Sequence, residues 1–430
     1  MFNFIKVFRS TIIKNFLIYS LGSILLKSIS VFIAPIIMRI LTPADYGLLS
    51  LVTSFINILV AIAGLGLRQL LSIEYFHCST CKRKSIVNDI VIVYIAIMVP
   101  VFIFLFLNMR TINNYIFLNK AYASLIAVSL LIVFFRFFNE LFYQIMQYRA
   151  IAFKLTVVQI FAAILMFSLN LLFVYSFRLG VLGFFMAQLI SIVTVSLLGI
   201  LFYFGQSYHI SLCIAYSLSK AGFYVRKGLP FIPRMLFAWI LAVGDRWVLA
   251  KYSTLSNVGI YSVADMFGQL FQFIVLIPIT YAYLPPLFEK FAANKKNILK
   301  VEKWNQKNML TCMVIMFVLV SIGYFILRPL VYVLIPQKYN QSFVYVWFLL
   351  IGQIFLLGSY FASAFLQFQK RIHFLVISLL VPAGVNILLN IILIPRFHIW
   401  GCVFATVISY LFYFVITVFY NWYIQKKCFF

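Results

Sequence analysis

The sequence predicts an all-α integral membrane protein with about twelve transmembrane helices. Of its 430 residues, 65% are hydrophobic and only 10% are charged, whereas soluble domains carry about 25% charged residues. The mean hydropathy is +1.08, and the apolar residues are gathered into long runs separated by short polar stretches. This composition is typical of a chain that lies in a lipid bilayer, and it excludes a soluble fold.

Twelve apolar runs have close to the roughly 20 residues that a helix needs to cross the hydrocarbon core. Backbone groups in lipid must satisfy their hydrogen bonds within the protein, and the runs lack the alternation of barrel strands, so each run is predicted to be a helix. The predicted spans are 16–40, 47–67, 90–108, 121–142, 154–176, 182–204, 229–250, 259–286, 308–328, 342–367, 374–394 and 400–423.

Lys and Arg are distributed unequally between the two sets of loops. Most of them lie near both ends of the chain and in one set of loops, which includes the long segments 68–89, 205–228 and 287–307. Because positive residues favour the cytoplasmic side, both termini are predicted to be cytoplasmic, in agreement with an even number of helices. The net charge of +26 is therefore spread over loops, and binding of nucleic acid is not predicted.

The two halves of the chain resemble each other in three places. The matching segments are Leu41–Gly47 with Thr254–Ile260, Leu169–Val174 with Leu389–Ile394, and Gly183–Ser191 with Gly401–Ser409. Six helices in each half give both halves the same orientation, as in the parallel repeats of some transporters. We therefore predict two six-helix lobes, 1–204 and 229–430, joined by a cytoplasmic linker at 205–228, with any substrate bound where the lobes meet.

Charged residues in the seventh run need an explanation, because an apolar helix tolerates them only where they face an interior or each other. Arg234 and Asp245 are eleven residues apart, which would place them on one face of a straight helix, roughly 16 Å apart along its axis. Arg246 would point about 100° away from Asp245, so this adjacent pair cannot simply cancel.

Polar side chains also recur at helical spacing in other runs. Arg136 and Glu140 lie at i and i+4, where a structural ion pair and a role in a cavity are both open. Asp265 begins a stripe that continues with Gln269 and Gln272. Interhelical hydrogen bonding is the favoured interpretation for the uncharged amides elsewhere, namely Gln159, Asn170, Asn386 and Asn390.

Basic residues outnumber acidic ones within the predicted spans. The basic residues are Lys27, Arg39, Arg136, Arg234 and Arg246, and the acidic ones are Glu140, Asp245 and Asp265. Lys27 and Arg234 have no acidic residue within one turn of their own helix, and both would be costly facing lipid. This excess of positive charge favours an anionic substrate such as a phosphate or pyrophosphate.

Motifs for other chemistry are scarce. His77-Cys78-Ser79-Thr80-Cys81 contains a C-x-x-C beside a histidine, but the remaining histidines are scattered, and we do not predict a metal site. The sequence contains no Walker A, G-x-S-x-G or H-E-x-x-H motif, so neither ATP hydrolysis nor a known hydrolytic centre is indicated. No cofactor is predicted.

Three groups of residues resemble one known family. They are Gly22–Ser28 with Pro35–Gly47, Leu229–Pro233 with Gly244–Arg246 and Val258–Ser262, and Asn386–Pro395 with Gly401. In this order and spacing they are similar to the lipid-linked oligosaccharide flippases of the multidrug, oligosaccharidyl-lipid and polysaccharide exporter superfamily, over essentially the whole chain.

The resemblance implies two six-helix lobes around a central cavity with alternating access. It implies a membrane transporter, not an enzyme, that moves an undecaprenyl-pyrophosphate-linked glycan from the cytoplasmic to the outer leaflet of a bacterial inner membrane. The glycan would serve assembly of a surface polysaccharide such as an O-antigen or capsule. The implied partners are the polyprenyl-pyrophosphate-linked glycan, membrane lipids, and polysaccharide polymerase and chain-length proteins.

The resemblance also implies basic residues in the cavity that bind the pyrophosphate and glycan. The matching positions are Lys27, Arg136, Arg234 and Arg246. Asp245, Asp265 and Glu140 are candidate partner or coupling acids for a proton or sodium ion.

Two other functions stay open. A multidrug exporter could share the fold, although it would be expected to have an acidic cavity. A membrane glycan polymerase or ligase could have a similar number of helices, but it would be expected to carry a long outward loop, and no outward loop of the predicted topology is long.

Overall fold

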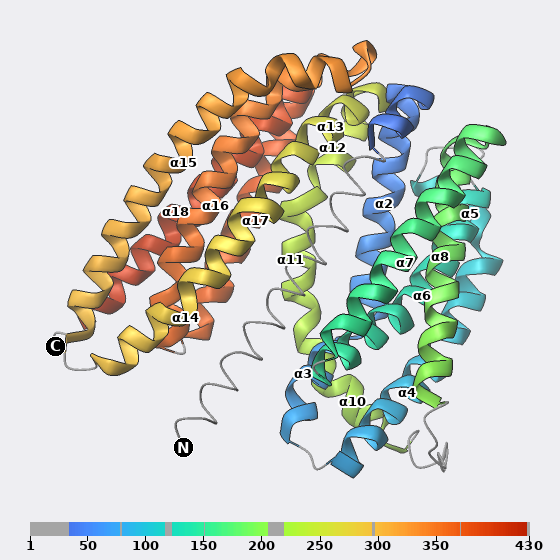
Figure 1. Cartoon of the computed structure of the whole chain (residues 1–430), viewed down its shortest axis with the longest axis horizontal. Helices are drawn as coiled ribbons and strands as arrows, with labels where there is room; N and C mark the ends of the chain where they lie inside the picture. Colours follow the sequence, from blue (N-terminus) through green and yellow to red (C-terminus); the bar gives the residue numbers. More distant parts are fainter. Residues whose placement is uncertain are drawn as a thin grey trace. The chain divides into compact units, whose positions relative to one another are not determined.

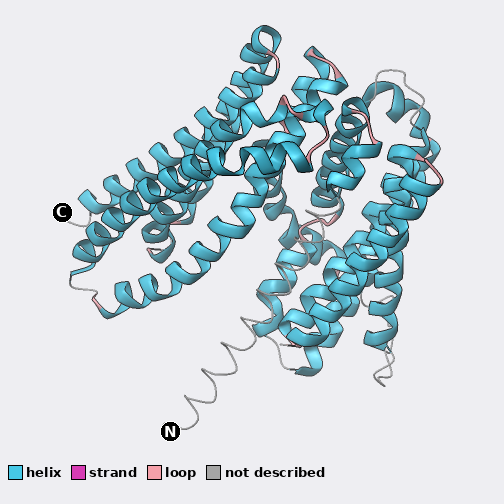
Figure 2. Ribbon diagram, turned by 45° about the horizontal axis from the view of Figure 1, so that its top comes forward, coloured by secondary structure: helices cyan, strands magenta, loops and turns pink. Residues whose placement is uncertain are grey.

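The computed structural model describes residues 34–77, 80–116, 123–149, 151–204, 219–294, 297–369 and 371–427. These residues form helices and connecting turns, and no strand occurs among them (Figure 2). The chain divides into two compact units. Unit 1 comprises Met1–Ile40 and Val52–Met235, and unit 2 comprises Leu41–Leu51 and Leu236–Phe430.

Unit 1 is a bundle in which α6, α7 and α8 pack against one another and α4 packs against α6 (Figure 1). In the turn between η1 and α8, Arg178 has a positive φ of 54°. The helices with described bounds are α3 (Leu67–His77), α4 (Thr80–Leu107), α5 (Met109–Ile116), α6 (Ala123–Tyr148), α7 (Ala152–Asn170), η1 (Leu171–Ser176), α8 (Gly180–Phe204), α10 (Ala221–Gly228) and η2 (Leu229–Phe231).

Two helices are shared between the units. Helix α2 (Pro43–Ala63) contributes its first residues to unit 2 and the rest to unit 1, and α11 (Ile232–Val243) is divided after Met235.

Unit 2 has α16 and α18 at its centre, with α13, α15 and α17 packed around them. Its helices are α12 (Asp245–Tyr252), α13 (Leu255–Phe271), η3 (Gln272–Leu276), α14 (Ile277–Ala293), α15 (Ile298–Leu334), η5 (Gln337–Tyr339), α16 (Ser342–Phe368), α17 (Ile372–Phe397) and α18 (Ile399–Lys427). Helix α13 runs through the π-helical η3 into α14 as one long path.

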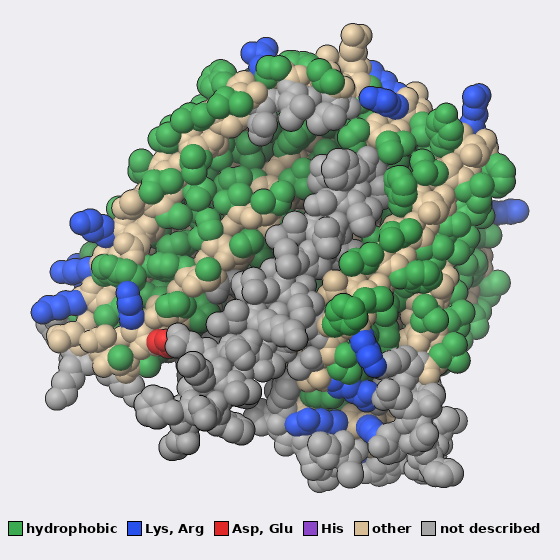
Figure 3. All heavy atoms as spheres, in the orientation of Figure 1, with side chains coloured by type: hydrophobic (Ala, Val, Ile, Leu, Met, Phe, Trp, Pro, Cys, Tyr) green, Lys and Arg blue, Asp and Glu red, His purple; other side chains and the backbone are tan. Residues whose placement is uncertain are grey.

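The predicted all-α membrane fold is confirmed. Within the described ranges, ten helices are long and apolar enough to cross a bilayer, or eleven if the bent pair 221–243 and 245–252 counts as one span. These eleven correspond in order to the second through twelfth predicted runs. Most of the first run, 16–40, lies outside the described residues. Its last part, 34–40, is described and is helical. Hydrophobic side chains cover most of the visible surface of these helices (Figure 3).

Matching corners of the two halves support the predicted repeat. A Cβ on Gly183 would lie 3.0 Å from the carbonyl oxygen of Phe173, and one on Gly401 would lie 2.7 Å from that of Leu393. The turn before each glycine contains a residue with positive φ, Arg178 at 54° and His398 at 49°. Equivalent glycines thus allow equivalent close approaches in the two halves, because any side chain there would meet the preceding helix.

The first turns of α2 and α13 are equivalent elements that contact each other inside unit 2. A Cβ on Gly47 would lie 2.0 Å from the Leu255 carbonyl oxygen, and one on Gly259 would lie 1.9 Å from the Pro43 carbonyl oxygen. The backbones can approach this closely only because both positions are glycine. Ser262 Oγ donates to Ser50 Oγ at 2.7 Å, and these serines are 212 positions apart, as are the two glycines.

The same offset relates the starts of these two helices. Thr42 Oγ1 accepts from the Asp45 backbone N–H at 3.2 Å, and Thr254 Oγ1 accepts from the Asn257 N–H at 3.2 Å. Both threonines therefore supply an acceptor for the free N–H groups of a helix start. The Tyr339 hydroxyl donates to the Leu41 carbonyl oxygen at 3.0 Å, and burial raises the pKa of Tyr339, which keeps the phenol protonated as a donor.

Part of the predicted linker is a helix packed on unit 1. Helix α10 lies against α3 and α4. The Tyr224 hydroxyl donates to Asp89 Oδ2 at 2.9 Å, and Lys227 Nζ pairs with Glu74 Oε1 at 2.9 Å. The lobe boundaries at 204 and 229 stay a prediction, whereas the division between the units falls after Met235.

Candidate functional site

A cluster of charged side chains in unit 1 joins three helices. Arg136 and Glu140, one turn apart on α6, pair at 2.9 Å between Nε and Oε1. Arg68 of α3 pairs through Nη1 with the other oxygen of Glu140. Arg136 Nη1 also donates to Asn57 Oδ1 of α2 at 3.0 Å. The predicted pair is thus present, but it is part of a larger cluster, which we call the arginine cluster (Arg68, Arg136, Glu140 and Asn57).

The arginine cluster is partly open and carries excess positive charge. The side chains of Arg68, Arg136 and Glu140 are 28%, 30% and 23% exposed, and two guanidinium groups share one carboxylate. Arg68 Nε is buried and donates to no acceptor among the described residues. A guanidinium has five N–H donors, so the cluster retains donors for an anion, and planar guanidinium forks match phosphate oxygens well.

A second charged cluster lies in unit 2 and is closed. Arg246 Nη2 donates to Asp265 Oδ2 at 2.5 Å, and Gln269 Nε2 donates to the same oxygen at 2.8 Å. The side chains of Arg246 and Asp265 are only 8% and 12% exposed. Asp245 is buried beside them and accepts from the hydroxyl groups of Tyr261 and Thr406. We call these six residues the aspartate cluster.

The aspartate cluster has more acid than base, because it contains two carboxylates, Asp245 and Asp265, and one guanidinium, Arg246. Its members come from α12, α13 and α18, so the hydrogen bonds connect three helices of unit 2. Burying an ion pair carries a large desolvation penalty, which is offset only when the two charges pair closely and accept or donate further hydrogen bonds. Asp245 Oδ1 and Arg246 Nε have no hydrogen-bond partner within the described part of the chain. This geometry suits a structural or ion-coupling role better than direct contact with a large anionic headgroup.

The prediction that Arg234 and Asp245 share one face of a straight helix is wrong. Gly244 separates α11 from α12, and the path bends by 51° at this point. Asp245 therefore begins a new helix and is buried, whereas Arg234 is exposed on α11. Lys27 lies outside the described residues, so the structure does not place it relative to either cluster.

Several functional candidates were not predictable from spacing along the chain. Arg68 falls at the start of the predicted loop 68–89, yet it lies on α3 and pairs with Glu140. Tyr261 and Thr406 reach Asp245 from α13 and α18. No sequence signal marks these three residues, because each contact depends on how helices rotate and pack. By contrast, the Asp265–Gln269 and Asn386–Asn390 contacts follow from i, i+4 spacing.

Metal ligands do not gather in the part of the chain that the structure describes. No group of three or more His, Cys, Asp or Glu side chains there could hold a metal ion. Cys78 of the C-x-x-C segment lies outside the described residues.

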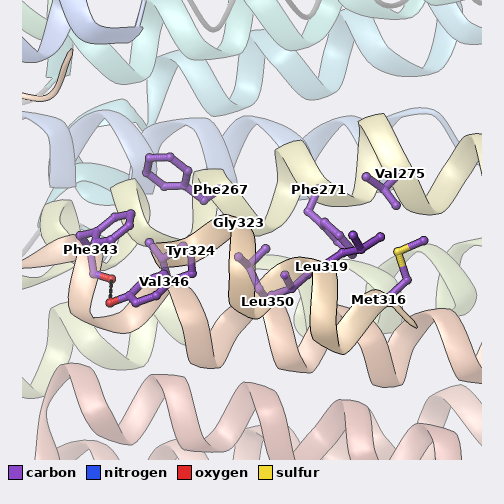
Figure 4. Close-up of a pocket in the computed structure, with 11 residues that line it drawn as sticks. Phe267, Phe271, Val275, Met316, Leu319, Gly323, Tyr324, Phe343, Val346 and Leu350 are labelled. Atoms are coloured by element: carbon purple, nitrogen blue, oxygen red, sulfur yellow. Dashed lines mark hydrogen bonds between the residues drawn. The ribbon is translucent and has the colours of Figure 1, made fainter. Parts of the chain in front are cut away.

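Unit 2 also contains an apolar pocket of about 410 Å³ between α13, α15 and α16 (Figure 4). Its lining includes Phe267 and Phe271 of α13, Leu319 and Tyr324 of α15, and Leu350 of α16. The Tyr324 hydroxyl is already occupied, because it donates to a backbone oxygen of α16 at 3.3 Å. A pocket with this lining suits a hydrocarbon chain and not a pyrophosphate, which would lose its hydration without gaining donors.

Solved structures to which this chain is similar include membrane transporters. A multidrug resistance MATE family transporter of the MOP superfamily, in an inward-facing conformation, has a TM-score of 0.73 and 15% identity over 95% of this chain and 98% of its own. The lipid II flippase MurJ, in an inward closed conformation, has a TM-score of 0.74 and 13% identity over 94% and 87% of the two chains. At these identities the likeness shows a shared fold.

A third structure, a MOP superfamily transporter from Pyrococcus furiosus described as having a binding pocket of reverse polarity, has a TM-score of 0.61 and 15% identity over 95% and 94%. No curated protein sequence matches the chain. The sequence profile described as polysaccharide biosynthesis protein matches residues 12–291, well over half of the chain. The chain therefore belongs to the polysaccharide biosynthesis protein family, and its fold is that of a multi-pass flippase or exporter.

Proposed function

We propose that this protein is a flippase for a polyprenyl-pyrophosphate-linked oligosaccharide, the undecaprenyl form in a bacterial inner membrane. It moves the glycan unit from the cytoplasmic to the outer leaflet by alternating access, for assembly of a surface polysaccharide. The observation that carries this proposal is the arginine cluster of unit 1, a partly open pair of guanidinium groups that share one carboxylate. Membership of the polysaccharide biosynthesis family supports the glycan as cargo.

The arginine cluster has the chemistry that a pyrophosphate headgroup requires. Glu140 pairs with both guanidinium groups, and the three side chains together keep a net positive charge. The Arg68 and Arg136 side chains are 28% and 30% exposed, and Glu140 and Asn57 use only some of their N–H groups, so donors remain that phosphate oxygens can satisfy. Interactions between such charges are stronger beside low-dielectric helices than in bulk water. The glycan follows the headgroup through the protein, while the hydrocarbon tail stays in apolar surroundings.

The remaining predicted site residues have different places in this proposal. Lys27, which lies outside the described residues, and the exposed Arg234 are proposed as additional cations that bind the headgroup. Arg246 is held by Asp265 in a buried pair, so its role is to maintain the aspartate cluster. Asp245 and Asp265 are the candidate acids for coupling to a proton or sodium ion. Both are buried, and the cluster holds two carboxylates but only one basic residue, Arg246. Polymerase and chain-length proteins of the polysaccharide pathway are the proposed partners.

The proposal is tested by replacing the two arginines in cells that depend on this protein for surface glycan. Arg68→Gln and Arg136→Gln should reach normal membrane levels and yet greatly reduce surface glycan. Arg149→Gln, which neutralises a basic residue just beyond the end of α6, is the matched control and should leave the glycan unchanged. Normal glycan in both Arg68→Gln and Arg136→Gln cells would contradict the assignment.

A multidrug exporter is the alternative that the fold also permits, since MATE transporters share it. The two functions make opposite predictions for cells that lack the protein. Loss of a flippase removes surface glycan and leaves drug susceptibility unchanged, whereas loss of an exporter raises drug susceptibility with glycan intact. Loss of chain length alone, with single glycan units still reaching the surface, would indicate a polymerase.

A further inference from the structure

The first turns of α15 are fixed to their neighbours by a buried polar network. Glu302 and Asn305 are fully buried. Asn305 Nδ2 donates to Glu302 Oε2 at 3.1 Å and to the Phe361 carbonyl oxygen of α16 at 3.2 Å. Both groups of the amide are used, because Asn305 Oδ1 accepts from the Tyr283 hydroxyl of α14 at 3.0 Å. This end of α15 is therefore attached to two other helices.

A second asparagine completes the network from α18. Asn421 Nδ2 donates to Glu302 Oε1 at 2.7 Å and to the Ala362 carbonyl oxygen at 3.2 Å. Asn421 Oδ1 accepts from Gln425 Nε2 at 3.1 Å. Each oxygen of Glu302 thus has a donor, and satisfied buried networks hold helices in one arrangement. The orientation of the first three turns of α15 is set by this network.

The opposite side of the same turns presents a row of lysines. Lys300, Lys303 and Lys307 are exposed, and their i, i+3, i+7 spacing places them on one helix face. Trp304 beside them is 41% exposed, and Lys290 Nζ of α14 lies 3.7 Å above its ring. Figure 3 shows basic side chains grouped over this end of the molecule. We call these four lysines with Trp304 the lysine face.

The row of exposed residues continues along α15 as apolar side chains. Leu310, Val314 and Phe317 follow the lysines at the same helical spacing and are 56%, 63% and 45% exposed. A helix face that changes from cationic to apolar within one turn marks the boundary between lipid headgroups and hydrocarbon. The exposed Trp304 agrees with this depth, because tryptophan favours the membrane interface. The lysine face therefore lies at the level of lipid phosphates.

We propose that the lysine face is a binding site for anionic phospholipids of the surrounding bilayer. The headgroup phosphate is bound by Lys300, Lys303, Lys307 and Lys290, and an acyl chain lies along Leu310 and the apolar residues beyond it. Charge complementarity supports a phosphate ligand, and the apolar continuation supports a lipid over a soluble polyanion. The proposal is independent of the glycan flippase function, since it involves neither charged cluster.

The test uses the full chain purified in detergent and measures lipid retained on the protein by native mass spectrometry. Phosphatidylglycerol and phosphatidylcholine are supplied in equal amounts. The Lys300→Gln/Lys303→Gln/Lys307→Gln variant should lose the preference for phosphatidylglycerol, with affinity reduced by roughly a hundredfold if each lysine contributes about fivefold near an anionic lipid surface. The corresponding triple Arg variant keeps the charge and should keep the preference.

A control on the same helix separates this site from general electrostatics. Arg328, exposed near the other end of α15, lies 5.7 Å from the centre of the Tyr332 ring, and Arg328→Gln should retain phosphatidylglycerol as the native protein does. Equal retention by the triple Gln variant and the native chain would overturn the proposal. So would a native chain that shows no preference for phosphatidylglycerol, or one whose bound phosphatidylglycerol is displaced by inorganic pyrophosphate at equal concentration.

Discussion

The arginine cluster and the aspartate cluster are built from similar groups and differ in exposure and balance of charge. In unit 1, two guanidinium groups share one carboxylate, and their side chains are 28% and 30% exposed. In unit 2, one guanidinium that is 8% exposed pairs with Asp265, and the cluster contains a second buried carboxylate, Asp245. A partly open cluster with spare donors can exchange protein contacts for ligand contacts. A closed cluster cannot do so without exposing buried charge. Mutations in the arginine cluster should therefore mainly change ligand binding, whereas mutations in the aspartate cluster should mainly lower stability.

The largest loss of stability is expected from Arg246→Ala. The substitution leaves Asp245 and Asp265 buried together without a cation, and breaking a buried pair on one side costs about 3–5 kcal/mol. Thermal unfolding of the purified protein in detergent measures this effect. Arg234→Ala, at an exposed position on α11, is the control and should unfold as the native protein does. An Arg246→Ala protein of native stability would show that the aspartate cluster is not structural.

A smaller loss is expected from Tyr261→Phe. The change removes one of the two hydroxyl groups that donate to the buried Asp245, and a hydrogen bond to a charged group contributes about 1.5–3 kcal/mol. The same unfolding assay applies. Tyr252→Phe, on the neighbouring α12 at 40% exposure, should have no measurable effect. If the two variants unfold alike, the hydrogen bond to Asp245 contributes nothing.

Glu140→Gln should change stability little. Ion pairs that are partly exposed contribute about 0–1 kcal/mol, and Glu140 is 23% exposed. The same change removes a negative charge from the arginine cluster, so binding of a pyrophosphate-linked lipid should become tighter or stay the same. Titration of the purified variant with a short-chain prenyl pyrophosphate measures this. Weaker binding would mean that Glu140 is needed to position the arginines.

Arg136→Lys is expected to have the smallest effect of the four. It preserves the charge and loses the planar fork that contacts both Glu140 and Asn57. Stability should stay within about 1 kcal/mol of the native value, and pyrophosphate binding should weaken less than in Arg136→Gln. Equal weakening in the Lys and Gln variants would show that fork geometry, and not charge, determines binding.

The sequence was sufficient for features that depend on one helix. Hydropathy located the spans from the second to the twelfth run, and i, i+4 spacing anticipated the contacts of Arg136 with Glu140 and of Asp265 with Gln269. The spans and the i, i+4 contacts can both be predicted from the sequence, because each depends on residues that are close together along the chain. Similar segments in the two halves also indicated the repeat that the matching glycine contacts support.

Features that depend on packing between helices could not be predicted from the sequence. The bend at Gly244 separates Arg234 from Asp245, although their spacing fits a single straight helix. Arg68 could not be paired with Glu140, because the two are 72 positions apart and their contact depends on how α3 and α6 are rotated. The same holds for Tyr261 and Thr406 beside Asp245. Composition thus indicated a positive interior, but it could not say which cluster is open.

The central claim is that the arginine cluster binds the pyrophosphate headgroup, and its most direct test is the affinity of the purified protein for a polyprenyl-pyrophosphate-linked sugar. Each charge-assisted hydrogen bond is worth about 1.5–3 kcal/mol, so Arg68→Gln and Arg136→Gln should each weaken binding by roughly ten- to a hundredfold. Their unfolding temperatures should match that of the native protein. Native affinity in both variants would contradict the account.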